Sequence, residues 1–286
     1  MFKNKESDMK FMMTLCSTLF ISLILGTSAY AERSKDELLM LGSSEEVGEA
    51  IAVEFDDRDL GFVDQRSVMN MTMKNAYGEE SYRKMTTRTL ERQDRSMGDK
   101  SLIVFESPRD VKGTALLSFA EILEQDEQWL YLPSLKRVKR ISSNNKSGPF
   151  VGSEFAYEDI TGNEIGKYSW KFLAIEECPG KEGVECFKLE ARPKYEYSGY
   201  TKRIVWVDTE EFRVQKVDFY DRKDALMKTQ NFIDYKQYLE KYWRADKWTM
   251  NNHQTEKRTD LEFTFYEFKT GLTDADFTQA ALKRIK

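Results

Sequence analysis

Apolar and polar residues alternate along most of the chain. In "VMNMTMKN", Met69, Met71 and Met73 fall on one face of an extended chain, and Asn70 and Thr72 fall on the other. A period of two is typical of a β-strand that buries one face. The same pattern recurs in "YRKMTTRTLERQ", "KSLIVFESP", "TALLSFAEI", "QWLYLP", "RVKRIS", "YSWKFLAIEE", "CFKLEAR", "TKRIVWVDTE", "FRVQKVDFYD", "LMKTQNFIDYKQY", "KWTMNNHQT" and "LEFTFYEFKT". The pattern therefore predicts a mainly β protein.

The predicted strands follow one another too closely for helical crossovers between them. Turn-like breaks such as "DTEE", "YDRKDA" and "EKRTD" separate many of the segments. Closely spaced strands pair as antiparallel hairpins, and a long meander of hairpins curls. We therefore expect one continuous, highly curved antiparallel sheet that forms a barrel or a partial barrel.

Helix signals lie near the two ends of the chain. Ser34 and Glu37 form a capping-box pattern before "LLML", which predicts a helix that runs to about Val53. Thr273 and Asp276 repeat the pattern before "FTQAALKRI". Both helices are expected to pack against the sheet.

The first 31 residues have the pattern of a secretory signal peptide. An apolar run from Phe11 to Leu25 follows a lysine, and small residues stand at Ala29 and Ala31. We expect residues 1–31 to be cleaved and residues 32–286 to form one domain in the periplasm. The alternative is an uncleaved anchor, although the run is shorter than the roughly 20 residues that a membrane span needs.

Export changes the interpretation of the cysteines. The predicted mature chain contains Cys178 and Cys186, which flank the turn-like "PGKEGVE" between two predicted strands. In an oxidising compartment, such a pair predicts a disulfide across a hairpin. The alternative, a redox or metal-binding pair, is less favoured because no histidine lies nearby.

Composition and motifs argue against several functions. The formal net charge is −5, which argues against a general nucleic-acid binder. The single histidine, His253, lies inside a predicted strand, and the motifs of nucleotide-binding, serine-hydrolase and zinc-protease sites are missing from the sequence. We predict a protein that is not an enzyme and has no cofactor or metal. A hydrolase of unfamiliar type remains an alternative.

The segment "QWLYLPSLKRVKRISSNNKSGPF" combines aromatic residues, a turn and a group of cations. Trp129 and Tyr131 share one face of a predicted strand, and Pro133 begins a turn. The cations that follow are Lys136, Arg137, Lys139 and Arg140. They form either a solvated strand surface or the border of an apolar site, where they would meet an anionic head group or an acidic partner.

This segment also carries a family resemblance. "DEQWLYLPSLKRVKRIS", followed by "NKSGPFVGSEFAYEDI", resembles the signature of the LolA-like outer-membrane lipoprotein-sorting proteins that are often associated with RND/MMPL-type exporters. The segments "GDKSLIVFESPRDVKGTALL" and "DADFTQAALKR" fit the same family, so the resemblance covers the chain from about Asp57 onward.

The resemblance implies an incomplete, half-open β-barrel whose helices close a hydrophobic cavity for acyl chains. It implies a monomeric periplasmic carrier that transfers a lipid or lipoprotein between membrane components toward the outer membrane. The alternative is a non-catalytic adaptor of an RND/MMPL-family transporter. The arginine often described for lipoprotein carriers has no assignable counterpart in this sequence.

Methionine and aromatic side chains are the candidates for the cavity wall, because methionine adapts to variable chains and aromatic rings bury large apolar surfaces. Each one alone could equally belong to an ordinary core. The expected acyl-chain contacts are Met69, Met71, Met73, Trp129, Tyr131 and Phe150, and the expected head-group or partner contacts are Lys136, Arg137, Lys139 and Arg140.

Overall fold

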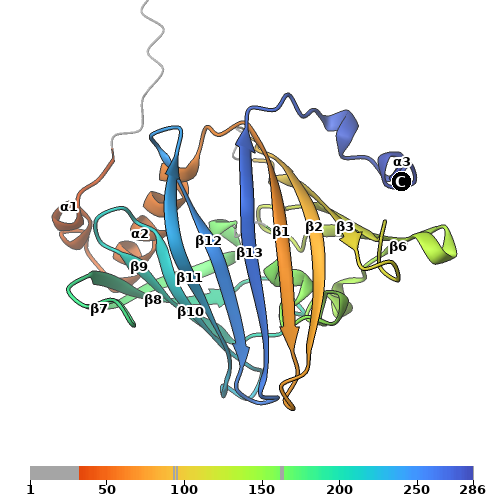
Figure 1. The fold of residues 1–286 in the computed structure, drawn as a ribbon. Helices are drawn as coiled ribbons and strands as arrows, with labels where there is room; N and C mark the ends of the chain where they lie inside the picture. The colour runs from red at the N-terminus through yellow and green to blue at the C-terminus, as the bar shows by residue number, and fades with distance from the viewer. Residues whose placement is uncertain (1–31, 93, 95, 162–163, 286) are drawn as a thin grey trace, which may run out of the picture. The chain divides into compact units, whose positions relative to one another are not determined.

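One sheet of thirteen strands accounts for most of residues 32–92, 94, 96–161 and 164–285, which are the residues described by the computed structural model (Figure 1). The strands are β1 (Asp64–Lys74), β2 (Glu80–Leu90), β3 (Lys100–Ser107), β4 (Ala115–Phe119), β5 (Glu127–Leu132), β6 (Arg137–Arg140), β7 (Tyr168–Glu177), β8 (Glu185–Pro193), β9 (Lys202–Asp208), β10 (Val214–Tyr220), β11 (Leu226–Tyr238), β12 (Tyr242–Asn252) and β13 (Lys257–Phe268). The segments with alternating residues therefore form the strands that the sequence predicts.

The sheet is antiparallel throughout and remains open. Its order is β6-β5-β4-β3-β2-β1-β13-β12-β11-β10-β9-β8-β7, so the first and last strands pair at its centre. The edge strands β6 and β7 do not pair with each other, and the two ends of the sheet curl behind the central strands (Figure 1). The prediction of a curved antiparallel sheet that forms an incomplete barrel is confirmed.

The N-terminal segment forms two helices in place of the single predicted helix. The Ser34–Glu37 capping box begins α1 (Lys35–Leu39), as predicted. A second capping box, made by Ser43 and Glu46, then begins α2 (Ser44–Asp59), which extends beyond Val53. The sequence analysis missed this second start signal. None of the described helices is long and apolar enough to span a bilayer.

Helix α2 packs closely against the edge strand β7, and Gly48 makes this approach possible. A Cβ atom at Gly48 would lie 2.6 Å from the backbone nitrogen of Phe172. Ile51 and Ala52, also in α2, are fully buried. The helix therefore covers part of the concave face of the sheet.

Residues 141–161, which we call the inner segment, cover another part of the concave face. Phe150 and Phe155 are fully buried in the same core as Met71. The backbone N–H of Glu154 donates to Thr259 Oγ1 at 3.0 Å, which ties the segment to β13. Short 3₁₀ helices occur in this region and in other connections: η1 (Pro133–Leu135), η2 (Ser143–Asn145), η3 (Phe150–Gly152), η4 (Tyr157–Asp159), η5 (Ile165–Lys167) and η6 (Asp274–Asp276).

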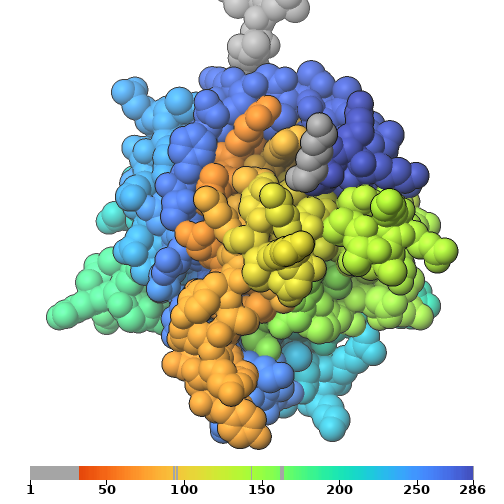
Figure 2. Space-filling model, turned by 45° about the vertical axis from the view of Figure 1, so that its right-hand side comes forward, coloured from red at the N-terminus to blue at the C-terminus, as the bar shows by residue number. Residues whose placement is uncertain are grey.

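The C-terminal segment covers the opposite, convex face of β3, β4 and β5. It contains η6 and the short helix α3 (Gln279–Leu282), and Leu272, Phe277 and Leu282 are buried there. Figure 2 shows this segment in dark blue over the upper part of the face, with the β1–β2 hairpin projecting below. The predicted capping box at Thr273 and Asp276 is present, although it begins a 3₁₀ turn.

Candidate functional site

A cavity of about 680 Å³ lies between the concave face of the sheet, helix α2 and the inner segment. Its volume falls within the range of roughly 300–1,000 Å³ that is usual for small-molecule sites. The exposed residues Glu32, Glu211 and Glu240 are among those that line it, so the cavity reaches the surface beside the β11–β12 hairpin.

Aromatic side chains dominate the wall formed by α2 and strands β7–β13. Trp248 lies at its centre, with ring centroids 5.3 Å from Phe232 and 5.1 Å from Phe263. Such edge and tilted contacts stabilise aromatic clusters beyond the area that they bury. The aromatic residues that line the cavity are Phe55, Phe62, Tyr168, Trp170, Phe212, Phe219, Phe232, Tyr235, Trp243, Trp248, Phe263 and Tyr266.

A bulge in β13 directs additional aromatic rings toward the cavity. Val68 pairs with Phe265 and Met69 pairs with Phe263, so one residue of β13 has no partner on β1. Because a bulge shifts the alternation of a strand by one residue, Phe263 and Tyr266 both line the cavity. Phe265, on the opposite face, is 49% exposed.

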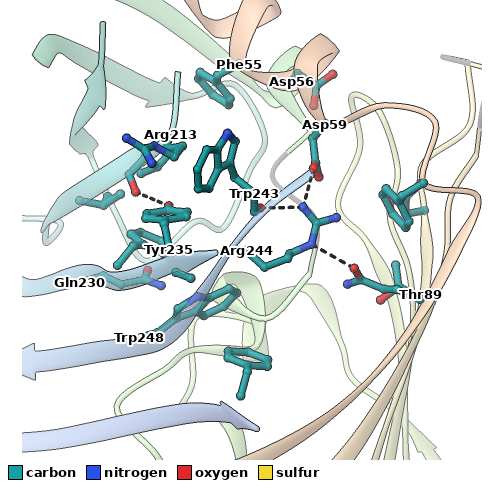
Figure 3. Close-up of a pocket in the computed structure, with 18 of the residues that line it drawn as sticks. Phe55, Asp56, Asp59, Thr89, Arg213, Gln230, Tyr235, Trp243, Arg244 and Trp248 are labelled. Carbon is teal, nitrogen blue, oxygen red and sulfur yellow. Dashed lines mark hydrogen bonds and ion pairs between the residues drawn. The ribbon is translucent and has the colours of Figure 1, made fainter. Parts of the chain in front are cut away.

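Two arginines lie among the aromatic rings. Arg244 donates to Gln65 Oε1 at 3.0 Å and pairs with Asp59 (Figure 3). Arg213 pairs with Asp208 at 2.8 Å, and its guanidinium lies 4.5 Å from the centre of the Trp243 ring. Both guanidinium groups thus combine an ionic partner with an aromatic face.

Buried charges hold the inner segment at the deep end of the cavity. Lys228 Nζ lies 2.8 Å from Asp159 Oδ2, with side-chain exposures of 3% and 1%. Burial, followed by the charge of Asp159, raises the pKa of Tyr200 well above its ordinary value, so its hydroxyl remains a donor to Asp159. Asp159 and Arg203 both line the cavity, and their guanidinium and carboxylate atoms lie 3.8 Å apart.

The wall formed by β1–β4 is mostly polar, with Met69 and Ile103 as its apolar members. Pairing places Gln65 opposite Thr89, Thr89 opposite Ser101 and Ser101 opposite Ser118. All four line the cavity, as do the neighbouring Ser67 and Thr87. We call Gln65, Thr89, Ser101 and Ser118 the polar row.

Asp99 lines the same polar wall. Burial raises the pKa of Asp99 to about 7; the hydrogen bond from the Arg92 backbone opposes this rise, and the nearby carboxylates of Glu164, Glu91 and Asp56 add to it. The backbone N–H of Arg92 donates to Asp99 Oδ1 at 2.7 Å. The two walls therefore differ in chemistry, and Figure 3 shows Trp243 and Trp248 on one side of Arg244 and Thr89 on the other.

The described residues offer no arrangement of three or more His, Cys, Asp or Glu that could hold a metal ion. His253 does not line the cavity, and its Nε2 lies 2.8 Å from Thr229 Oγ1. The cavity is thus equipped to bind and enclose a molecule, with apolar surface on one side and hydrogen-bonding groups on the other.

Comparisons with known proteins identify the family. A family model described as "Uncharacterized protein" matches residues 97–284. The structure of an outer membrane lipoprotein-sorting protein domain from Vibrio parahaemolyticus is 50% identical, with a TM-score of 0.80, and the match covers 84% of this chain and all of that one. The chain belongs to the LolA-like outer membrane lipoprotein-sorting family.

Two further structures support the assignment of this LolA-like chain. A DUF1329 family protein from Desulfovibrio piger is 26% identical, with a TM-score of 0.79 over 84% of this chain and 100% of that one. A LolA superfamily protein from Nitrosomonas europaea is 19% identical, with a TM-score of 0.65 over 82% and 98% of the two chains, and shows the shared fold. A search of curated proteins found no match.

The predicted acyl-chain contacts of this LolA-like chain lie in different places. Met69 lines the cavity. Met71 is fully buried in the same core as Phe150 of the inner segment, and Met73 packs against this core. The methionine stripe therefore faces the concave side, but only its upper end reaches the cavity.

Trp129 and Tyr131 require a correction, because they lie on the face of β5 that points away from the cavity. Both are buried with Leu117 and Phe277 under the C-terminal segment. The alternation of β5 is as predicted, but alternation does not show which face is concave. The adjacent Gln128 lies on the cavity side of the sheet, next to Ser118.

The predicted cationic contacts are exposed at an edge of the sheet. Lys136 forms a turn with φ of +49°, and Arg137, Lys139 and Arg140 belong to the edge strand β6. Arg140 pairs with Glu127 at 2.5 Å. None of the four lines the cavity, so their binding role remains a prediction.

The predicted disulfide between Cys178 and Cys186 is present and closes the β7–β8 hairpin. The sequence analysis missed the residues of the two walls, including Trp243, Arg244 and Trp248 from β12 and the polar row. The aromatic residues in "EKYWRADKW" and the hydroxyl residues in "TTRTL" were available signals. The sequence of neither segment shows which of its side chains face the cavity, because that depends on the fold.

Proposed function

We propose that the protein is a periplasmic carrier that shields an acyl chain of a lipid or lipoprotein in the cavity and transfers it toward the outer membrane. The observation that carries this proposal is the large aromatic wall inside an open sheet. An enclosed apolar wall removes an acyl chain from water, which is worth about 0.8 kcal/mol for each buried CH₂ group.

Family membership supports the choice of cargo. The Vibrio relative is described as a lipoprotein-sorting domain, and the match spans its whole length. An exported location agrees with the predicted signal peptide at residues 1–31, which lie outside the described residues. The disulfide suits the same oxidising compartment.

The proposed activity is non-catalytic transport. The two arginines among the aromatic rings are already engaged in ion pairs, Arg244 with Asp59 and Arg213 with Asp208. The cavity offers binding surface, and the direction of transfer would then depend on which membrane component binds the cargo more tightly.

The decisive experiment combines native purification with a blocked cavity. Lipids extracted from the protein purified out of its periplasm would be identified by mass spectrometry, and binding of a fluorescent fatty acid would be measured in solution. We expect Thr87→Trp to abolish binding, because Thr87 lines the cavity and the indole would occupy its volume.

Thr86→Trp is the matched control. Thr86 is the neighbouring residue of β2, is half-buried and does not line the cavity. The Thr86→Trp variant should bind the fluorescent fatty acid as the wild type does. Equal binding by the wild type and a folded Thr87→Trp variant, or absence of any lipid from the wild type, would contradict the proposal.

The exposed cations of the β5–β6 hairpin favour a second role as an adaptor of an RND/MMPL-type transporter. Among the described residues, Lys136, Arg137 and Lys139 make no ion pair, which leaves them available to an acidic partner. Charge reversal at these three positions should weaken capture of the transporter without changing lipid binding. Loss of lipid binding instead would assign the cations to the cargo.

A further inference from the structure

The polar row is an unusual feature of the concave face. Its pairing continues across five adjacent strands, from Gln65 on β1 through Thr89, Ser101 and Ser118 to Gln128 on β5. On β3–β5 the opposite face is apolar: Leu102, Val104 and Leu117 are buried under the C-terminal segment, as is Leu90 at the end of β2. At the level of the polar row, therefore, polar side chains face the cavity and Leu102 and Leu117 face outward, whereas farther along the same strands Ile103 and Leu116 lie on the concave side.

Contacts within the described part of the protein leave hydroxyl groups of the polar row without hydrogen-bond partners. Neither Thr89 nor Ser101 makes a side-chain hydrogen bond with another described residue, and both line the cavity. Gln128, which continues the row on β5 but does not itself line the cavity, is fully buried; its Nε2 donates to Tyr157 O at 3.0 Å, and its Oε1 has no partner among the described residues. Polar groups on an inner wall cost free energy unless something in the cavity hydrogen-bonds to them.

We propose that the polar row binds a neutral, hydroxyl-rich head group, such as a sugar, which enters the cavity together with the apolar part of the cargo. This inference deepens the proposed carrier function and rests on it. Ser and Thr hydroxyls both donate and accept, which matches the hydroxyls of a sugar. The aromatic wall on the other side takes the apolar chain.

The surrounding charges select against an anionic head group at this position. Asp56 and Asp99 line the cavity near the row, and their carboxylates would repel a phosphate. Three arginines that line the cavity are already paired with carboxylates: Arg244 with Asp59, Arg213 with Asp208 and Arg203 with Asp159. Asp99 instead offers carboxyl oxygens to the hydroxyl groups of a neutral ligand.

The test compares two ligands with the same eight-carbon chain, octyl β-glucoside below its micelle concentration and 1-octanol, by isothermal titration calorimetry. The wild type should bind the glucoside at least about tenfold more tightly, which is about 1.4 kcal/mol, because the sugar makes hydrogen bonds that 1-octanol cannot make. The combined variant Thr89→Val/Ser101→Ala/Ser118→Ala should lose this preference and bind 1-octanol nearly as the wild type does.

Thr72→Val/Thr86→Val provides the control on the opposite face of β1 and β2, and should keep the preference. Circular dichroism melting of each variant establishes that it is folded. Similar affinities of the wild type for the two ligands, or a preference that survives in the folded combined variant, would overturn the head-group assignment while leaving the carrier function intact. Failure to bind either ligand would overturn both proposals.

Discussion

Asp99 is a carboxyl group whose burial in the cavity wall should make stability depend on pH. Its pKa is raised from 3.8 to about 7, chiefly by burial and then by the charges of Glu164, Glu91 and Asp56. A raised pKa means that the folded state binds the proton more tightly than the unfolded state does. The stabilising contribution is therefore fully present below pH 3.8 and is lost as the pH rises through about 7.

Asp99→Asn should remove this dependence. The amide oxygen can still accept from the backbone N–H of Arg92, and no charge has to be buried. We expect the variant to exceed the wild type by roughly 2–4 kcal/mol in free energy of unfolding above neutral pH and to match it in acid. Urea unfolding across this pH range measures both effects, and parallel pH profiles of the two proteins would contradict the assignment.

At the scale of single residues, the sequence predicted the chemistry of a side chain better than it predicted which face of the sheet the side chain occupies. The cysteine pair was predictable because two cysteines at a hairpin turn can meet without help from the rest of the fold. Trp129 was predicted to contact cargo, but the C-terminal segment covers its face of β5. Phe263 and Phe265 look equivalent in the sequence, and the bulge in β13 alone decides which of them reaches the cavity.

The position of the inner segment depends on buried charge. Asp159, near its end, accepts from Lys228 Nζ at 2.8 Å and from the Tyr200 hydroxyl at 2.9 Å. Lys228 also donates to the backbone oxygen of Glu154 at 3.0 Å, so one ammonium group holds two points of the segment.

Lys228→Met should destabilise the protein by about 3–5 kcal/mol, because removing one partner leaves the other charge buried. Lys171→Met is the control: its ammonium pairs with Glu45 at 2.9 Å, and the two side chains are 46% and 61% exposed, so its loss should cost about 1 kcal/mol or less. Urea unfolding provides the values. Equal, small losses from the two changes would show that the Asp159 pair does not hold the segment.

At the scale of elements, the strands were predictable because alternation is a local property that each segment carries alone. The inner segment was not, because its loop-like sequence gives no sign that Phe150 and Phe155 pack inside the sheet. The N-terminal helix was also predicted only in part, since the second capping box at Ser43 and Glu46 was overlooked.

At the scale of the whole molecule, the sequence predicted an open curved sheet but could not position its cavity. The cavity depends on both halves of the sheet, which meet where β1 pairs with β13. Its polar wall comes from β1–β4 and its aromatic wall from α2 and β7–β13, so residues far apart in the chain share one space. Only long-range pairing brings them together.

This arrangement predicts that cargo stabilises the two halves together. A fatty acid at about 100 times its Kd should add about 2.7 kcal/mol to the free energy of unfolding, which corresponds to roughly 5–10 °C in Tm for a chain of this size. Amide hydrogen exchange should slow both in β2–β4 and in β9–β12, because the ligand contacts both walls. Thr86→Trp should retain this response and Thr87→Trp should lose it. Protection confined to one half of the sheet would indicate a surface site on that half and would exclude the shared cavity as the place where cargo binds.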